Sequence, residues 1–252
     1  MNHKIRRDPQ GVPHVLGENA EEVYRAMGYC HAMDRGGQIL FMRILAQGRA
    51  SEILDSSDKM LEVDKFFRKM NPGEEEDLSK LSPSARLACE AYCDGINRYF
   101  ARKSPLEFKW LGYKIEPWRV QDSLLISRMV AYVSLAQSQG GIEKLAMEMV
   151  QAGVDRERLE ELFPGLLQEL DIPLILKTNL GHRLLPPDLS GLPVSPQMAS
   201  NNWVVSGKKT ASGSPILSND PHLETDRLPN VWYEIVLQMN ERYVMGDRKS
   251  VV

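Results

Sequence analysis

Ser200 opens a stretch whose residue types can support nucleophilic chemistry at the edge of a sheet. The stretch Ser200–Gly207 reads SNNWVVSG, and four prolines and one glycine lie just before it, between residues 186 and 196. A Gly-rich segment to Gly213 and then Ile216-Leu217 follow, so the pattern predicts strand, tight turn and strand. A serine where a proline-rich linker becomes a strand suits backbone cleavage, because the linker can bend while the strand holds the serine. The alternative is a turn capped by its own Ser and Asn side chains.

The elements that would position Ser200 change along the chain from helices to strands. Residues 3–16 are predicted to form a hairpin, and Asn19 is predicted to cap a helix with a break at Gly36-Gly37. Apolar residues then recur at three- and four-residue steps, and strands return after residue 200. Further helices are predicted over residues 57–70, 82–100, 121–135, 142–151 and 156–162, with an irregular segment at 103–118 and a break or bend at Gly140-Gly141.

These patterns predict three parts. Residues 1–170 are expected to be mainly helical, residues 171–199 to be a spacer that is mostly loop, and residues 200–252 to begin a β-sheet. The fold class that follows is α+β.

The bulk composition excludes several classes of protein. The chain is 42% hydrophobic and 26% charged, which is ordinary for a globular protein, and its net charge of −3 indicates no nucleic-acid or membrane partner. The apolar centre of a signal peptide is missing after Met1, and no apolar run approaches the ~20 residues of a membrane span. As written, the sequence predicts a cytoplasmic protein; a start further upstream would allow a periplasmic or secreted one.

The three cysteines are too few and too scattered for a disulfide framework. Cys89 and Cys93 are four residues apart in a helical pattern, with no further Cys or His nearby to complete a metal site. We interpret them, and Cys30, as small apolar residues or free thiols.

Six blocks of sequence occur in a defined order along the chain. They are Arg7–His14 (RDPQGVPH), Ala26–Arg35 (AMGYCHAMDR), Gly48–Glu52 (GRASE), residues 108–123 with LGY, EPW and DS, Ser200–Gly207, and Ser218–Leu223 (SNDPHL). Leu228-Pro229 and Trp232-Tyr233-Glu234 continue the last block. Together, over nearly the whole chain to about Met245, these blocks resemble the penicillin acylase (penicillin amidase) family.

The resemblance implies an N-terminal-nucleophile hydrolase with an αββα sandwich, here incomplete. In that family a precursor cleaves itself before a serine and yields a small, largely helical subunit and a large subunit that begins with that serine. Ser200 matches this residue and residues 171–199 match the spacer. The implied activity is hydrolysis of an amide, removing the acyl side chain of a β-lactam antibiotic or of a similar small N-acyl compound, by a heterodimer of the two processed parts.

The chemistry of such a site follows from the nucleophile. A serine hydroxyl is a weak nucleophile and needs a base. A free α-amino group has a pKa near 7.7–8.0, so it is partly neutral at pH 7 and can serve as that base. Cleavage of the Ala199–Ser200 bond would create this amine beside the Ser200 hydroxyl, acting through a water. The acyl group would pass to the Ser200 oxygen and leave as a carboxylate on hydrolysis.

Other residues carry weaker expectations. His222 matches a position where the family uses His or Gln to orient the amine of the nucleophile; alternatively, it is a turn residue after Asn-Asp-Pro. We expect Asp34 and Arg35 to form a buried ion pair that holds two helices, with a catalytic role as the alternative, and His14 and His31 to be structural. Aromatic and Met residues between 110 and 149 are expected in the core, with an acyl pocket as the alternative. No cofactor is expected. A structural calcium is implied by the family alone; its acidic ligand in the small subunit would lie near Gly140-Gly141, and Glu143 is the one acid near that position.

The sequence departs from the family after Met245. The large subunit of the family is several hundred residues longer than residues 200–252, and Asp247–Val252 do not continue the family pattern. The sequence is therefore expected to be truncated, and the asparagine and backbone N–H of the family's oxyanion hole are expected beyond it. Two hypotheses stay open: an acylase, or a non-catalytic remnant or half that requires a separately encoded partner.

Overall fold

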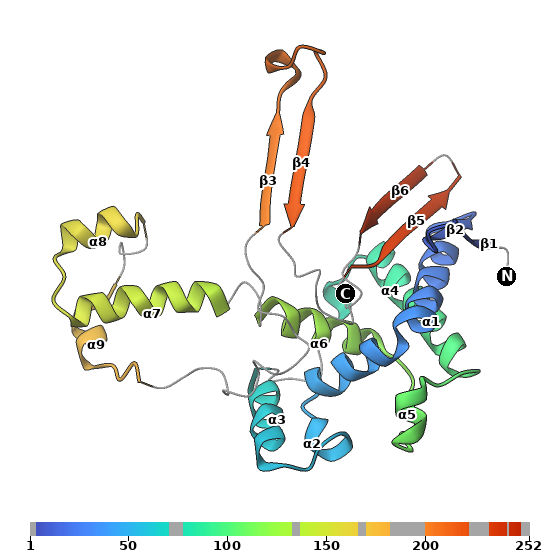
Figure 1. The fold of residues 1–252 in the computed structure, drawn as a ribbon, viewed down its shortest axis with the longest axis horizontal. Coiled ribbons are helices and arrows are strands. Elements are labelled where there is room, and N and C mark those ends of the chain that lie inside the picture. Colours follow the sequence, from blue (N-terminus) through green and yellow to red (C-terminus); the bar gives the residue numbers. More distant parts are fainter. Residues whose placement is uncertain are drawn as a thin grey trace. The chain divides into compact units, whose positions relative to one another are not determined.

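The structure is a computed structural model that describes residues 4–70, 78–132, 137–165, 170–181, 200–221, 232–240 and 242–247. The chain divides into two compact units (Figure 1). The first unit contains residues 1–130 and 224–252, and the second contains residues 131–223. The first unit therefore combines both ends of the sequence.

Helices make up most of the first unit. The helices of this unit are α1 (Ala20–Ala46), α2 (Ala50–Ile53), α3 (Asp58–Met70), the short η1 (Leu78–Lys80), α4 (Pro83–Phe100), α5 (Leu106–Trp110) and α6 (Val120–Ala131). The segment predicted to be irregular at 103–118 thus contains α5, and α6 begins one residue before the predicted start. Among the helices of the described ranges, none has the length and apolarity that crossing a bilayer requires.

A four-stranded sheet joins the two ends of the chain. Its strands are β1 (Lys4–Arg7), β2 (Pro13–Gly17), β5 (Glu234–Met239) and β6 (Arg242–Asp247), in the order β1-β2-β5-β6. The hairpin predicted over residues 3–16 is confirmed as β1-β2, and β5-β6 form a second hairpin. The two hairpins meet through a parallel pairing that sets Val15 opposite Leu237. Helices with a sheet confirm the predicted α+β class.

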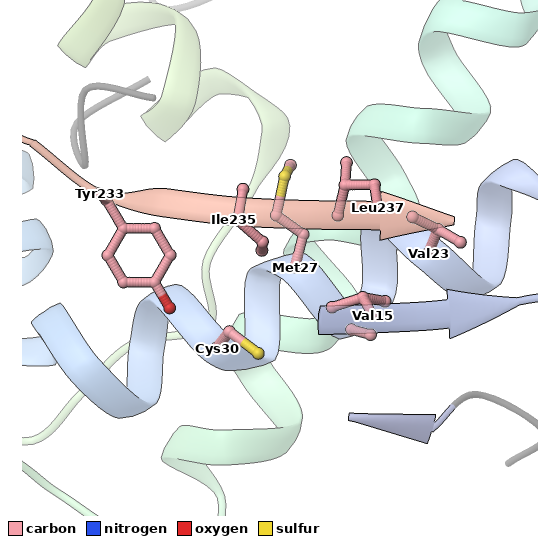
Figure 2. Close-up of a cluster of buried hydrophobic side chains, with 8 residues drawn as sticks. Val15, Val23, Met27, Cys30, Tyr233, Ile235 and Leu237 are labelled. Atoms are coloured by element: carbon pink, nitrogen blue, oxygen red, sulfur yellow. The ribbon is translucent and has the colours of Figure 1, made fainter. Parts of the chain in front are cut away.

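The core of this unit lies between α1 and the sheet (Figure 2). Val23, Met27 and Cys30 follow one another at steps of three and four residues along α1, so they share one face of the helix. Burial of this apolar face against strands from both ends of the sequence stabilises the unit. The buried members of the cluster are Val15, Val23, Ala26, Met27, Cys30, Tyr233, Ile235 and Leu237.

Helix α1 begins where the sequence predicts and continues through the predicted break. The Asn19 side chain accepts a hydrogen bond of 3.0 Å from the Glu22 N–H, which confirms the predicted cap. The helix continues through Gly36-Gly37 to Ala46, with its single departure from helical geometry at Arg35 (φ −130°, ψ 22°). The kink thus falls one residue before the predicted break, at a residue held by tertiary contacts.

Helices α1 and α4 approach each other closely at two glycines. A Cβ atom on Gly28 would lie 2.1 Å from the carbonyl oxygen of Tyr92, and one on Gly95 would lie 1.9 Å from that of Arg25. Both distances are far below a van der Waals contact, so the crossing requires glycine on each helix.

The second unit contains three helices and a hairpin among its described residues. They are α7 (Gln137–Gln151), α8 (Arg156–Leu162), α9 (Ile172–Lys177) and the strands β3 (Ser200–Val205) and β4 (Ile216–Pro221), with the short η4 (Gly207–Lys209) in the turn. Gln151 donates hydrogen bonds to the carbonyls of Ile175 and Thr178, at 2.7 and 2.8 Å, and so holds α9 on α7.

The break predicted in this unit is wrong. Helix α7 runs through Gly140-Gly141 without the predicted break, and the Gln139–Glu143 hydrogen bond of 2.7 Å spans the pair. Glycine lowers helix propensity but does not end a helix whose other contacts support it. The predicted spacer, residues 171–199, begins with the short helix α9, and residues 182–199 lie outside the described part.

Burial makes the three thiols differ in reactivity. All are free; Cys30 and Cys93 are buried, whereas Cys89 is half-buried. Burial raises the pKa of the Cys30 and Cys93 thiols to about 12. At pH 8 their thiolate fraction is therefore about 10⁻⁴. We expect a disulfide reagent to modify Cys89 first and the other two only on unfolding, as measured by absorbance with and without urea.

The raised pKa of the Cys30 and Cys93 thiols also makes the free energy of unfolding depend on pH. The unfolded chain releases these thiol protons near pH 8.5–9, whereas the folded chain keeps them to about pH 12. The contribution of the two protonated thiols to the free energy of unfolding is therefore fully present below pH 8.5, and it is lost as the pH rises toward 12. Equal reaction rates of all three cysteines with the disulfide reagent in the folded chain would contradict the burial of Cys30 and Cys93 on which both predictions rest.

Candidate active site

Ser200 is the first residue of strand β3. Strands β3 and β4 form an antiparallel ladder that pairs Ser200 with Pro221 and Trp203 with Ser218 (Figure 1). The strand, turn and strand predicted from the sequence are confirmed. Ala199 and His222 lie outside the described residues, so the ladder holds the backbone of Ser200 opposite the residue that precedes His222 in sequence.

The turn between the two strands is held by its own hydrogen bonds. The Thr210 hydroxyl lies 3.1 Å from the carbonyl oxygen of Gly207 and 2.8 Å from that of Ser214. A Cβ on Gly207 would lie 2.2 Å from the carbonyl oxygen of Gly213, so the turn needs glycine at position 207. Local contacts therefore fix the register that places Ser200 at the start of the ladder.

The faces of this hairpin carry apolar side chains that the second unit does not cover. Trp203, Val204, Ile216 and Leu217 are all exposed, and they alternate between the two faces of the ladder. A two-stranded hairpin is at best marginally stable alone, so these faces are suited to packing against further structure.

Asp34 and Arg35 lie at the kink of α1 and contact the chain just before β5. Arg7 donates two hydrogen bonds to the Asp34 carboxylate, at 2.7 and 2.8 Å, and the Tyr233 hydroxyl donates a third of 2.6 Å. Arg35 donates to the Trp232 carbonyl oxygen at 3.0 Å. The predicted Asp34–Arg35 ion pair is therefore wrong: consecutive side chains of a helix point apart, and each finds a different partner.

This network ties together three elements that are distant in sequence. Burial, and then the hydrogen bond to Asp34, raise the pKa of the Tyr233 hydroxyl, which keeps it a donor. The hydrogen bond with Asp34 also raises the pKa of Arg7. Sequence reasoning missed Arg7 and Tyr233 as partners of Asp34. The one available signal was that all three lie in the blocks shared with the family.

Both histidines of the described first unit make structural contacts. His31 is fully buried, with Nδ1 2.9 Å from the Tyr92 hydroxyl and its ring edge-on to that of Tyr233 at 4.6 Å. His14 Nε2 lies 3.2 Å from Asp8 Oδ2 in the β1-β2 hairpin. These positions agree with the structural roles predicted for them.

The EPW and DS blocks also lie in a structural network. Arg43, which is 1% exposed, donates to the Glu116 carbonyl oxygen at 3.0 Å and lies over the Trp118 ring. Asn97 of α4 makes two hydrogen bonds to the Trp118 backbone. Trp118, Ile126 and Met129 are buried as core residues, whereas Trp110 is exposed. The other aromatic and Met side chains described between residues 110 and 149, namely Tyr113, Tyr132, Met147 and Met149, are half-buried.

Among the described residues, no group of three or more His, Cys, Asp or Glu side chains is placed so that it could hold a metal ion. Glu143, the one acid near the expected position, accepts a hydrogen bond from Gln139 on the same helix.

The Tyr233 hydroxyl is expected to contribute measurably to stability. Tyr233→Phe keeps the buried ring and removes one hydrogen bond to a carboxylate, so we expect a loss of about 1.5–3 kcal/mol in the free energy of unfolding. Urea unfolding followed by circular dichroism measures this. Tyr243→Phe is the matched control, because Tyr243 lies on the neighbouring strand and is exposed. Equal effects of the two variants would contradict the role of Asp34 as the acceptor.

Comparison with known proteins agrees with the sequence blocks. The model of the penicillin amidase family matches residues 2–247. The acyl-homoserine lactone acylase QuiP of Pseudomonas aeruginosa is 30% identical over 98% of this chain and 30% of its own length. The penicillin acylase 2 proenzyme of Pseudomonas sp. (strain SE83) is 30% identical over 87% of this chain and 30% of its own length.

A solved structure, a thermostable penicillin G acylase from Alcaligenes faecalis, is 23% identical with a TM-score of 0.48, covering 68% of this chain and 93% of its own. The chain spans about 30% of the length of the curated relatives it matches. Because the family model covers nearly the whole sequence, the chain belongs to the penicillin amidase family, within the N-terminal-nucleophile hydrolases.

Proposed function

We propose that this chain carries the nucleophile of an amide-hydrolysing acylase and that Ser200 is that nucleophile. The observation that carries the proposal is the placement of Ser200 as the first residue of β3, directly after the spacer, in a chain that belongs to the penicillin amidase family. A nucleophile at the start of a paired strand keeps a defined backbone position once the bond before it is cut.

Self-cleavage would generate the catalytic group. The Ser200 hydroxyl attacks the Ala199 carbonyl carbon, the C–N bond breaks, and an ester forms between Ala199 and Ser200. Water then hydrolyses the ester, leaving a carboxylate on Ala199 and a free α-amino group on Ser200. That amine has a pKa near 7.7–8.0 and can accept the proton of the Ser200 hydroxyl during acyl transfer.

Substrate hydrolysis would repeat the same steps on an external amide. Ser200 takes the acyl group, the amine product leaves with the proton, and water releases the acid. His222 is proposed to orient the Ser200 amine, because it follows Pro221, the ladder partner of Ser200. A calcium ion has no assigned role in these steps.

The proposed substrates are small N-acyl amides. The relatives are an acyl-homoserine lactone acylase and a penicillin acylase. The two substrate classes to test are therefore N-acyl homoserine lactones and β-lactams that carry an acyl side chain. In both, the bond that breaks is an amide outside the ring.

The two processed parts are proposed to stay together as a heterodimer. The β2–β5 pairing, the shared apolar core and the Arg7–Asp34–Tyr233 network all join residues before position 199 to residues after position 200. None of these contacts involves the bond that would be cut.

Mass spectrometry of the purified chain under denaturing and native conditions tests the proposal. We expect a C-terminal fragment that begins at Ser200 when the chain is denatured, and one complex of unchanged total mass, apart from one water, when it is native. Acyl release from N-acyl homoserine lactone and from penicillin G is then measured by mass spectrometry. An intact 28.6 kDa chain without acyl release would overturn the proposal.

The second candidate is a non-catalytic chain, or a part that works only with a further polypeptide. The exposed apolar faces of the β3-β4 hairpin favour it, because they are suited to packing against more structure. An uncleaved chain that gains acylase activity only when a second polypeptide is added would select this candidate.

A further inference from the structure

Helix α5 presents an exposed apolar face on the first unit. Phe108 is 2% exposed and packs against Tyr113, with ring centroids 5.5 Å apart, which fixes the orientation of this short helix beside α1 (Figure 1). Leu106 and Trp110 are four residues apart, so they share the side of the helix away from Phe108. They are 57% and 79% exposed, and Leu111 continues the patch at 52%.

Basic residues flank this apolar face. Arg102 and Lys103 precede α5, Lys109 lies on it and Lys114 follows it, and all four are exposed. None of them forms an ion pair with an acidic residue of the described ranges. The charge of the segment is therefore positive although the whole chain carries −3.

The acidic residues of the segment are directed elsewhere. A carboxylate oxygen of Glu107 lies 1.6 Å from the position that a Cβ on Gly37 would take, so this side chain is turned back onto α1. Glu116 pairs with Arg49 at 3.1 Å. Glu107 is exposed on the side toward α1, so Glu107 and the paired Glu116 offset only part of the four positive charges around the apolar face.

We propose that the α5 surface, defined as Arg102, Lys103, Leu106, Lys109, Trp110 and Leu111, binds an anionic lipid bilayer. Tryptophan and leucine side chains enter the boundary between headgroups and acyl chains, while lysine and arginine bind lipid phosphates. A nucleic acid offers phosphates but no apolar layer for Leu106 and Leu111. The inference goes beyond the proposed acylase activity and does not depend on it.

Sedimentation of the full chain with lipid vesicles tests this inference. We expect binding to phosphatidylcholine vesicles that contain about one third phosphatidylglycerol, weaker binding at high salt, and none to phosphatidylcholine alone. Trp110→Ala is expected to weaken binding about 10-fold, and Lys103→Gln and Lys109→Gln about 5-fold each. Circular dichroism checks that the variants stay folded, which exposed positions favour.

Matched controls separate this surface from general charge and exposed aromatic groups. Arg156→Gln with Arg158→Gln removes two positive charges on α8, and Trp203→Ala removes another exposed tryptophan. Both are expected to leave lipid binding unchanged. Failure to bind the anionic vesicles, equal loss in the controls, or equal binding of a DNA duplex would overturn the assignment to lipid.

Discussion

Ser200→Ala is expected to leave the bond between residues 199 and 200 intact and to lower any acylase rate by a factor on the order of 10⁴–10⁶. The effect is large because the Ser200 hydroxyl is proposed to act in both self-cleavage and acyl transfer from the substrate. Its loss also prevents formation of the α-amine that would act as base. Mass spectrometry reports the cleavage, and product release from N-acyl amides reports the rate. Ser200→Cys keeps a nucleophile at the same position and is expected to retain self-cleavage.

Ser218→Ala is the matched control for this prediction. Ser218 lies in the same hairpin and pairs with Trp203 in the ladder, so its loss removes a hydroxyl without changing the start of β3. We expect normal cleavage in this variant. Cleavage at residue 199 in the Ser200→Ala chain would show that another group attacks the bond, and equal loss of cleavage in Ser218→Ala would assign the effect to the hairpin fold.

Gly95→Ala is expected to lower the free energy of unfolding by about 3 kcal/mol, the upper part of the range for overpacked cores. The new Cβ would lie 1.9 Å from the Arg25 carbonyl oxygen, and a backbone atom cannot turn aside as a side chain can. Helices α1 and α4 must therefore separate along their contact. In a chain of this length the melting temperature would fall by roughly 6–12 °C, as measured by circular dichroism.

Gly28 is the second glycine at the crossing of α1 and α4, and it tests the same steric argument. Gly28→Ala meets the Tyr92 carbonyl oxygen at 2.1 Å and should cost a similar amount, but both costs arise from the same separation of the helices. The double variant is therefore expected to lose less than the sum of the two. Gly141→Ala in α7, whose Cβ would meet nothing within 4 Å, should gain about 0.5–1 kcal/mol. A loss there equal to that at Gly95 would contradict the steric argument.

The candidate site shows which of its features sequence could predict. The start of β3 at Ser200 follows from prolines before it, the apolar residues Trp203–Val205 within it and a Gly-rich turn after it, and the structure agrees. The roles of Ser200 and His222 in catalysis stay predictions that the experiments above test. The contacts of Asp34 were not predictable, because a carboxylate beside an arginine in sequence gives no sign of a tyrosine 199 residues away.

The sequence by itself determined the features that depend on neighbouring residues. The β1-β2 turn, the Asn19 helix cap and the β3-β4 hairpin each arise from side chains and backbone groups within a few positions of one another. Membership of the penicillin amidase family was also visible in the ordered sequence blocks.

Only the tertiary structure decided the parallel pairing of β2 with β5 and the kink of α1 at Arg35. It also decided that Asp34 and Arg35 contact residues 232–233 and not each other. The physical reason is that each of these features depends on packing between distant segments, whose energy exceeds the small local preferences that periodicity and propensity report.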